Sequence, residues 1–316
     1  MKAVAITAYG GREQLTLMDL PDPVPGPGEV LIRIRAAGVN PVDHKIRRGL
    51  LATRMPNHFP LIIGLECAGE VAATGPGVTR VRVGDAVMAY ARKEYLRDGT
   101  YAELIVLPET SVSRKPACLS FEQAAVLPLA GLTSYQALRE LGGLAAGLTV
   151  LIHAGAGGTG GYGIQLARHA GARVITTASA ANHDYVRARG ADAVIDYTRE
   201  DFRVAVRRWA PAGVDLAYDT VGGEVQVRSA EVVRLGGLLV SLIAFADAIA
   251  LQALGIRTQY LFVRPQTAQL DELARLAEAG VVTPDVTAVL PLAEAARAHE
   301  LIERGHTRGK IALHVA

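Results

Sequence analysis

Cysteine, one-sided charge and long apolar runs are all scarce in this chain of 316 residues. Its two cysteines, Cys67 and Cys118, are too few for a disulfide framework and are not spaced like zinc ligands. The formal net charge is +2 and lysine and arginine form no run, so the charge pattern does not predict binding to nucleic acid. Glycine and polar residues interrupt the most apolar stretch, residues 235–254, which argues against a membrane span. Residues 1–10 lack the features of a signal peptide, and together these absences predict a reducing, cytoplasmic setting.

The first third of the chain has the pattern of short β-strands. Runs rich in Val, Ile, Leu, Thr and Tyr alternate with turn signals such as the Pro- and Gly-rich segment 21–28. Strands are expected at 2–7, 15–19, 29–37, 68–74, 86–90 and 101–107. Closely spaced strands with few helices predict a small β-barrel or sandwich.

After about residue 119 the pattern changes to alternating helices and strands. Ser120 and Gln123 form a capping box that predicts a helix over 121–127, and a second helix is expected over 133–141. Strands are then expected at 149–153, 173–177, 193–196, 214–219 and 238–243, with helices at 158–170, 182–189, 201–209 and 224–234. This alternation predicts an α/β fold with a doubly wound parallel sheet, covered by helices on both faces.

The C-terminal segment contains both types of element again. Leu270, Leu273 and Leu276 have helical spacing, and Gly280 is expected to end their helix. Further elements are expected as strands at 259–263 and 311–315 and as a helix at 292–303. The length of the chain favours two domains.

A glycine-rich segment follows the first strand of the alternating region. Gly155, Gly157 and Gly160 have the spacing G-x-G-x-x-G, directly after an apolar strand and at the start of a helix, which is the context that a dinucleotide-binding turn requires. The glycines let the backbone approach a pyrophosphate, and the first amides of the helix point at its oxygens. The residues expected to contact the cofactor here are Ala156, Gly157, Gly158, Thr159 and Gly160. The alternative is an ordinary glycine-rich turn without a ligand.

The end of the second strand bears on which nicotinamide cofactor is bound. NAD-binding sites normally place a carboxylate there for the ribose 2′-hydroxyl, whereas residues 174–180 contain none. The residues that are expected to receive a 2′-phosphate are Ser179, Asn182, His183 and Tyr197. NADPH is therefore the predicted cofactor. For Ser179 and Asn182 the alternative role is to cap the helix that follows.

Several segments together resemble the medium-chain dehydrogenase/reductase superfamily, and specifically its zinc-free quinone oxidoreductase (zeta-crystallin-like) family. The resemblance is carried by residues 36–43, 63–71, 83–87, 121–125, 130–133, 153–160, 218–222 and 308–311. It implies a GroES-like β-barrel domain formed by residues 1–118 and joined by 264–316, and a Rossmann NADPH-binding domain formed by 119–263. The family also implies an active cleft between the two domains.

Departures from the zinc-dependent members of that superfamily point to the reaction. Those enzymes have cysteine where Asn40 stands, histidine where Leu65 stands and a second cysteine near Ala130, so that only Glu66 of the catalytic set is retained. One carboxylate does not hold zinc in a tetrahedral site, and no metal is expected. Without a Lewis acid, the favoured acceptors are quinones and α,β-unsaturated carbonyl compounds, whose reduced anions are delocalised.

The resemblance also implies roles for residues in the first domain. Asn40 is expected near the nicotinamide or the substrate, Lys45 is expected to orient a substrate or ribose oxygen, and Tyr90 is a candidate proton donor. For Tyr90 the alternative is a tyrosine of the core or the rim. Asp43 is expected to cap the helical turn that follows Asn40.

Further cofactor contacts are implied outside the glycine-rich segment. Thr133, at the start of a helix, resembles the family's cofactor-contacting threonine. The backbone of Leu242, Ile243 and Ala244 is expected to meet the nicotinamide carboxamide. Lys310 is expected to reach the cofactor from the returning tail.

Two other functions and one assembly remain open at this point. An enoyl-thioester reductase for carrier-bound acyl chains would need basic residues along its cleft, for which Arg47, Arg48 and Arg54 are candidates. A cofactor-binding protein with little turnover, acting structurally or as a redox sensor, is the other alternative. The apolar run 237–254 and the strand 259–263 predict a homodimer through the edge of the Rossmann sheet, with simple core burial as the alternative.

Overall fold

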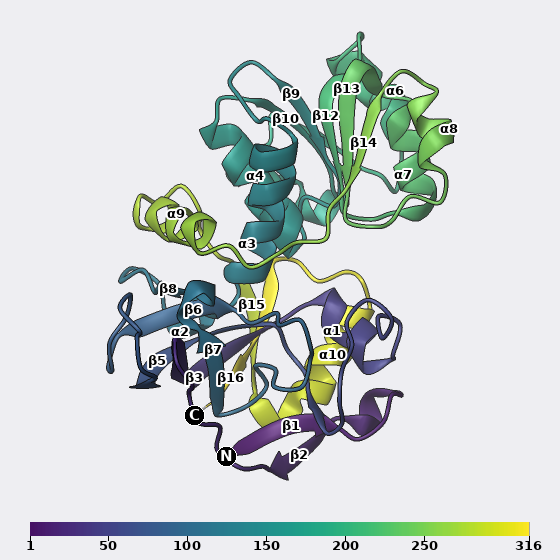
Figure 1. Cartoon of the computed structure of the whole chain (residues 1–316). Coiled ribbons are helices and arrows are strands. Elements are labelled where there is room, and N and C mark those ends of the chain that lie inside the picture. Colours follow the sequence, from purple (N-terminus) through teal and green to yellow (C-terminus); the bar gives the residue numbers. More distant parts are fainter. Residues whose placement is uncertain (316) are drawn as a thin grey trace. The chain divides into compact units, whose positions relative to one another are not determined.

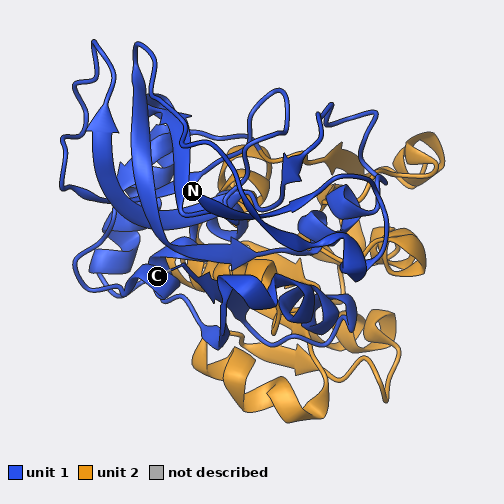
Figure 2. Cartoon of the chain, turned by 90° about the horizontal axis from the view of Figure 1, so that it is seen from below, with its two compact units in different colours: residues 1–132, 264–316 blue, residues 133–263 orange. Residues whose placement is uncertain are grey.

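The computed structural model describes residues 1–315, which divide into two compact units. Unit 1 comprises residues 1–132 and 264–316, of which 316 is not described, and unit 2 comprises residues 133–263 (Figure 2). The sequence-based division at residue 118 differs from this grouping, because helix α2 (Phe121–Ala125) packs on strands β3 (Glu29–Val39) and β5 (Glu66–Thr74) of unit 1. The C-terminal segment belongs to unit 1, as the resemblance implies.

Unit 1 is built mainly on antiparallel strands, with β15 and β16 paired in parallel. A seven-stranded sheet has the order β15-β16-β3-β5-β6-β8, with β7 also paired to β3. Besides β3 and β5, its strands are β6 (Ala86–Tyr90), β7 (Leu104–Pro108), β8 (Val112–Arg114), β15 (Val286–Pro291) and β16 (Lys310–His314). A smaller sheet has the order β2-β1-β4, formed by β1 (Lys2–Ile6), β2 (Thr16–Asp19) and β4 (Leu61–Ile62). These strands confirm the predicted GroES-like domain.

The returning tail completes the larger sheet of unit 1. Strand β16 runs antiparallel to the end of β3, with Ile311 opposite Val39 and Leu313 opposite Ala37. The helices of this unit are α1 (Pro41–Arg47), α2, the first part of α3 (Pro128–Tyr135), α9 (Thr267–Glu278) and α10 (Ala295–Glu303). The predicted capping box is present at α2, where Ser120 Oγ accepts from the Gln123 amide at 3.2 Å and Gln123 Oε1 accepts from the Ser120 amide at 3.0 Å.

Unit 2 is the predicted doubly wound sheet. Its six parallel strands have the order β11-β10-β9-β12-β13-β14, so the chain starts in the middle and winds outward in both directions (Figure 1). The strands are β9 (Thr149–Ile152), β10 (Arg173–Thr177), β11 (Ala193–Ile195), β12 (Val214–Asp219), β13 (Val233–Ser241) and β14 (Arg257–Tyr260). The switch point lies between β9 and β12, where ligands bind in folds of this type.

Helices cover both faces of this sheet. They are α4 (Gly158–His169), α5 (His183–Ala188), α6 (Phe202–Trp209), α7 (Gly223–Ala230) and α8 (Ala248–Gln252). Side chains alternate along β9, so Val150 and Ile152 enter the core on one face and Leu151 enters the core on the other. The two separate cores confirm the α/β fold class.

The observed elements differ from the expected ones in several places. Helix α3 begins at Pro128 rather than at Thr133, and residues 136–141 continue it as a π-helix. The last strand of unit 2 is Arg257–Tyr260 rather than 259–263, and the apolar run before it contains the short helix α8. Strand β15 has no counterpart in the predictions, although its sequence is largely apolar, and none of its residues is buried.

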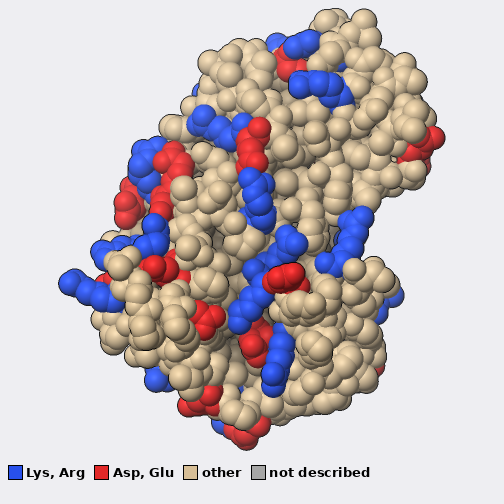
Figure 3. Space-filling model, in the orientation of Figure 1, with Lys and Arg blue, Asp and Glu red and all other residues tan. Residues whose placement is uncertain are grey.

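No helix within residues 1–315 is long and apolar enough to cross a bilayer. Short 3-10 turns occur at Arg12–Gln14, Glu109–Ser111, Ala180–Asn182 and Leu292–Glu294. On the face drawn in Figure 3, lysine and arginine side chains lie beside aspartate and glutamate and do not form one continuous basic surface.

Candidate functional site

The glycine-rich turn connects β9 to helix α4. Ala154 takes a positive φ of 50°, and the Gly157 amide donates to the Ala154 carbonyl at 3.0 Å, which closes the turn. Gly157 is the N-cap of α4, and no acidic residue occupies the first turn of the helix. The first amides of a helix have no partner within it and carry a partial positive charge, so this turn is suited to an anion.

Two of the glycines are required by space. A Cβ on Gly155 would lie 2.1 Å from Thr176 Oγ1, and a Cβ on Gly160 would lie 2.4 Å from the Ala154 carbonyl oxygen. Gly161, one residue later, has room, because its nearest neighbours would lie at 3.6 Å and 3.7 Å. The backbone of the turn is therefore packed at a distance that only glycine permits at positions 155 and 160.

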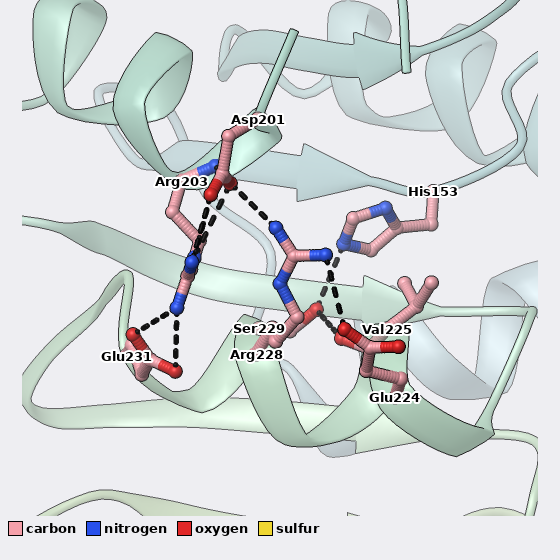
Figure 4. A network of polar contacts seen from close by, with 8 residues as sticks. All are labelled: His153, Asp201, Arg203, Glu224, Val225, Arg228, Ser229 and Glu231. Atoms are coloured by element: carbon pink, nitrogen blue, oxygen red, sulfur yellow. Dashed lines mark hydrogen bonds and ion pairs between the residues drawn. The ribbon is translucent and has the colours of Figure 1, made fainter. Parts of the chain in front are cut away.

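His153, which immediately precedes Ala154, stabilises this turn through a set of hydrogen bonds. The Ser229 hydroxyl donates to the Val225 carbonyl at 2.6 Å, so its oxygen is left to accept from His153 Nε2 at 2.8 Å (Figure 4). His153 Nδ1 then accepts from Thr177 Oγ1 at 3.3 Å, and Thr177 Oγ1 accepts from the Ala154 amide at 3.0 Å. These bonds fix the tautomer that carries its proton on Nε2.

The imidazole of His153 is neutral near pH 7. Burial lowers its pKa from 6.5 to about 4, and the nearby Asp219 opposes this shift only in part. The ring of Phe202 packs on it edge to face at 4.8 Å, and the Arg228 guanidinium lies 5.2 Å from the centre of the same Phe202 ring. Arg228 is held by Asp201 at 2.8 Å and Glu224 at 3.3 Å, which ties α7 to the start of α6 (Figure 4).

The end of β10 gathers three of the predicted 2′-phosphate residues. Asn182 Nδ2 donates to Ser179 Oγ at 3.1 Å, and His183 Nε2 lies 3.3 Å from the Ala178 carbonyl. Tyr197, after β11, is 51% exposed. One carboxylate of this region, Asp196, accepts from the amide and the hydroxyl of Thr198 at 3.0 Å and 2.6 Å, and these hydrogen bonds lower its pKa. The Asp196 carboxylate thus accepts hydrogen bonds from groups of its own turn.

The segment expected to meet the nicotinamide follows β13. The Leu242 amide donates to the Asp219 carbonyl at 3.1 Å, and the Ile243 amide donates to Ser241 Oγ at 3.0 Å. Ala244 is exposed. The segment thus lies at the carboxyl end of the sheet, as does the glycine-rich turn, because all strands of unit 2 are parallel.

Unit 1 contains a buried cluster around Asn40. Asn40 Nδ2 donates to Glu66 Oε1 at 2.8 Å, and the Lys310 ammonium donates to Glu66 Oε1 at 2.8 Å, to the Val39 carbonyl at 3.3 Å and to Asn40 Oδ1. Glu66 Oε2 accepts from the Leu129 amide at 2.7 Å. All three hydrogens of the ammonium are used inside unit 1, so Lys310 serves Asn40 and Glu66 rather than presenting a donor to a ligand.

A second part of this cluster was missed from the sequence. Asp43 Oδ2 accepts from the Asn40 amide at 2.7 Å, which confirms its predicted capping role, and also from the Tyr101 hydroxyl at 3.1 Å. Tyr101 lies 3.3 Å from His299 Nε2, and Arg47 donates to His299 Nδ1 at 3.1 Å. Burial raises the pKa of Asp43 to about 7 and lowers that of His299 to about 3.

Arg47 is only 2% exposed and is paired with Glu303 at 2.7 Å. The expectation that Arg47 lines a cleft for a carrier phosphate is therefore wrong, because its guanidinium is buried and paired inside unit 1. Nothing in the local sequence distinguishes Arg47 from Arg48, which is exposed.

The three remaining candidates, Tyr90, Lys45 and Thr133, occupy different environments. Tyr90 is opposite Glu66 in the sheet and only 2% exposed, and burial raises the pKa of its phenol, which makes it a weaker acid. Lys45 is half-buried on α1. Thr133 is 4% exposed and lies inside α3 rather than at its start, because Glu66 Oε2 accepts the Leu129 amide and so caps the helix earlier.

The residues of unit 1 do not fit a zinc ion. Among residues 1–315, no group of three or more histidine, cysteine, aspartate or glutamate side chains is arranged to hold a metal. Both Glu66 oxygens are occupied by internal donors, and burial raises the pKa of the neighbouring Cys67 thiol and so keeps it protonated. The Lys310 ammonium supplies the positive charge beside Glu66.

A GroES-like unit and a doubly wound unit with a glycine-rich turn after its first strand define the class of medium-chain dehydrogenases/reductases. Residues 26–117 match the family model described as alcohol dehydrogenase GroES-like domain, and residues 189–313 match the one described as zinc-binding dehydrogenase. A quinone oxidoreductase of Pseudomonas aeruginosa is 37% identical over 99% of this chain and 99% of its own length.

Solved structures agree with this assignment. A quinone oxidoreductase from Coxiella burnetii has a TM-score of 0.91 at 36% identity, covering 100% of this chain and 99% of its own. A mycobacterial protein complexed with NADPH has a TM-score of 0.90 at 33% identity, covering 100% of both chains. The chain belongs to the zinc-free, quinone oxidoreductase-type family of medium-chain dehydrogenases/reductases, and it is an oxidoreductase.

Proposed function

We propose that this protein transfers hydride from NADPH to a quinone or to an α,β-unsaturated carbonyl compound, without zinc. The observation that carries the proposal is the turn from Ala154 to Gly160, whose packing tolerates no Cβ at Gly155 or Gly160 and whose helix end favours an anion. When bound, NADPH supplies the hydride. The residues of the chain bind it, orient it and place hydrogen bonds around the acceptor.

The glycine-rich turn is assigned to the pyrophosphate. Gly157 and Gly158 present backbone alone at the start of α4, and Ala156, Thr159 and Gly160 complete the turn. Because the amides at this end are fixed by the Ala154–Gly157 hydrogen bond before a ligand arrives, little ordering is left to be lost on binding.

Ser179, Asn182, His183 and Tyr197 are assigned to the 2′-phosphate. The first three already form one polar group at the end of β10, and no carboxylate ends that strand. Asp196 is one nearby acid, and its hydrogen bonds to Thr198 hold it in its own turn. Asp184, which follows His183, is paired with Arg187 at 3.5 Å. A dianionic phosphate therefore meets neutral donors and an imidazole there, which favours NADPH over NADH.

On the acceptor side we retain Asn40 and Lys45 as contacts and withdraw Tyr90; Lys310 is withdrawn as a cofactor contact. Asn40 is held at both ends of its amide by Glu66 and Lys310, which makes it a rigid neutral donor. Tyr90 is buried and weakly acidic. A delocalised product anion needs only hydrogen bonds and a proton from water. The choice of this acceptor class is supported by residues 1–315, which contain no zinc-binding donor set.

A homodimer through strand β14 is part of the proposal. Strand β14 is the last strand of its sheet, and Leu235 and Ile249 nearby are 77% and 82% exposed. A hollow of about 470 Å³ lined by Leu238, Gln252 and Thr258 runs along this edge. The strand itself is polar, but an open sheet edge with exposed apolar side chains beside it is commonly covered by a second chain. Both cysteines are unpaired, and we propose a reducing, cytoplasmic location.

The test is a steady-state panel of paired quinones and enones with NADPH and with NADH, on protein whose zinc content has been measured. We expect turnover with NADPH at substoichiometric zinc, and kcat/KM for NADH lower by about tenfold or more. Turnover that depends on added zinc, or preference for NADH, would contradict the proposal. Tight NADPH binding without oxidation by any acceptor would favour a structural or sensor role, and activity with enoyl thioesters alone would favour the carrier-linked reductase.

A further inference from the structure

Helix α7 carries two buried polar side chains whose function is not yet explained. Gln226 is 3% exposed and Ser229 is fully buried, and their spacing of three residues places them on one face of the helix. That face packs against strands β12 and β13. Both side chains reach loops at the carboxyl ends of strands, where the proposed cofactor contacts lie.

Gln226 holds the segment that follows β13. Its Nε2 donates both hydrogens, to Ser241 Oγ at 2.8 Å and to the Ile243 carbonyl at 2.9 Å. Ser241 in turn donates to Asp219 Oδ2 at 2.6 Å, so the same hydroxyl oxygen accepts from Gln226 and from the Ile243 amide. The amide and the carbonyl of Ile243 are therefore both fixed by this set of bonds.

Ser229 holds the strand that leads into the glycine-rich turn. It accepts from His153 Nε2 at 2.8 Å, and His153 immediately precedes Ala154, whose positive φ begins the turn. The Thr220 hydroxyl donates to the His153 carbonyl at 3.0 Å, which adds a second link from the loop after β12. Helix α7 thus contacts residues that hold the 242–244 segment and residues that hold the glycine-rich turn.

The loop after β12 packs closely against Ile243. Gly222 has a φ of 82°, and a Cβ there would lie 2.7 Å from Ile243 Cγ1. Asp219 Oδ1 accepts from the amides of Val221 and Gly222 at 2.9 Å each. Ile243 is consequently confined by α7 and by the Gly222 turn together.

We propose that Gln226 and Ser229 are positioning residues, which fix the 242–244 segment and the glycine-rich turn relative to each other and thereby set how the two ends of NADPH are held. Neither side chain is assigned a contact with the cofactor. The inference rests on the proposed function, because it concerns the binding site of NADPH. Gln226 acts on the nicotinamide end, through Ile243, whereas Ser229 acts on the pyrophosphate end, through His153.

This difference makes the proposal testable with a ligand that lacks the nicotinamide. Adenosine 2′,5′-bisphosphate and NADPH are titrated into the wild type, Gln226→Met and Ser229→Ala, and kcat is measured with one quinone. Gln226→Met keeps the side-chain volume but removes the amide donor. We expect it to weaken NADPH binding and to lower kcat, each by about tenfold, while the affinity for the bisphosphate stays within about twofold. Ser229→Ala is expected to weaken both ligands by similar factors.

The matched control is Thr149→Val, which removes a buried hydroxyl at the opposite, amino end of β9, where Thr149 Oγ1 accepts from Arg173 at 3.1 Å. It is expected to leave both affinities and kcat unchanged. If Gln226→Met does not fold, Ser241→Ala removes the shared acceptor and is read in the same way. The proposal is overturned if Gln226→Met and Ser229→Ala both match Thr149→Val, or if Gln226→Met, or Ser241→Ala in its place, weakens the two ligands equally. A wild type that binds neither ligand would instead overturn the proposed function.

Discussion

His153 shows how a single buried side chain links the stability of unit 2 to pH. Its pKa is lowered from 6.5 to about 4, so the folded protein binds fewer protons than the unfolded chain between these two values. The stabilisation is complete above pH 6.5 and is lost as the pH falls toward 4, by about 3 kcal/mol in all. We expect urea denaturation of His153→Gln to show a correspondingly weaker dependence on pH than the wild type. An unchanged pH profile in the variant would contradict this assignment.

At the same scale, the sequence could predict residues whose role depends on nearby backbone. Gly155 and Gly160 were predicted because a strand, a tight turn and a helix follow one another locally, and Asp43 because capping is a local interaction. Arg47 and His299 could not be recognised, since they meet across 252 positions and neither has a local signal. The supporting role of Gln226 was missed for the same reason.

Among the elements, β5 and β16 are linked by the buried pair of Glu66 and Lys310. Removing one partner leaves the other charge buried and unpaired, so we expect Lys310→Met to lower the free energy of unfolding by about 3–5 kcal/mol. The double variant Lys310→Met/Glu66→Gln is expected to recover part of that loss, because Gln still accepts from Asn40 without a charge. Urea denaturation of the two single variants and the double variant measures this coupling. Losses that simply add would contradict a direct interaction.

Strands and helices with strong periodicity were predicted well, and the exceptions have physical causes. Strand β10 and strand β12 match the expected residues, because both are buried, short and bounded by turns. Helix α3 was placed too late, since its start depends on Glu66, which caps it from a distant strand. Strand β15 was missed although its composition suits a strand, and it pairs in parallel with β16 at the edge of the sheet.

For the whole molecule, we expect an assembly of two chains through β14. We expect light scattering to give twice the chain mass of 33.3 kDa for the wild type. A charge at an exposed apolar position beside the edge, as in Ile249→Lys or Leu235→Lys, is expected to shift the protein toward the monomer. Val24→Lys, at a position of unit 1 that is 84% exposed, is the control and should leave the mass unchanged. A monomeric wild type, or variants that remain dimeric, would contradict this assembly.

The proposed function depends on a nicotinamide dinucleotide bound on the glycine-rich turn at the start of α4. Two adjacent glycines test it directly, because a Cβ on Gly160 would lie 2.4 Å from the Ala154 carbonyl oxygen, whereas one on Gly161 would have room. In a fluorescence titration with NADPH, we expect the wild type and Gly161→Ala to bind within about twofold of each other, and Gly160→Ala to bind at least about tenfold more weakly. Binding by Gly160→Ala as tight as that of the wild type, or no binding of NADPH by the wild type, would contradict the account.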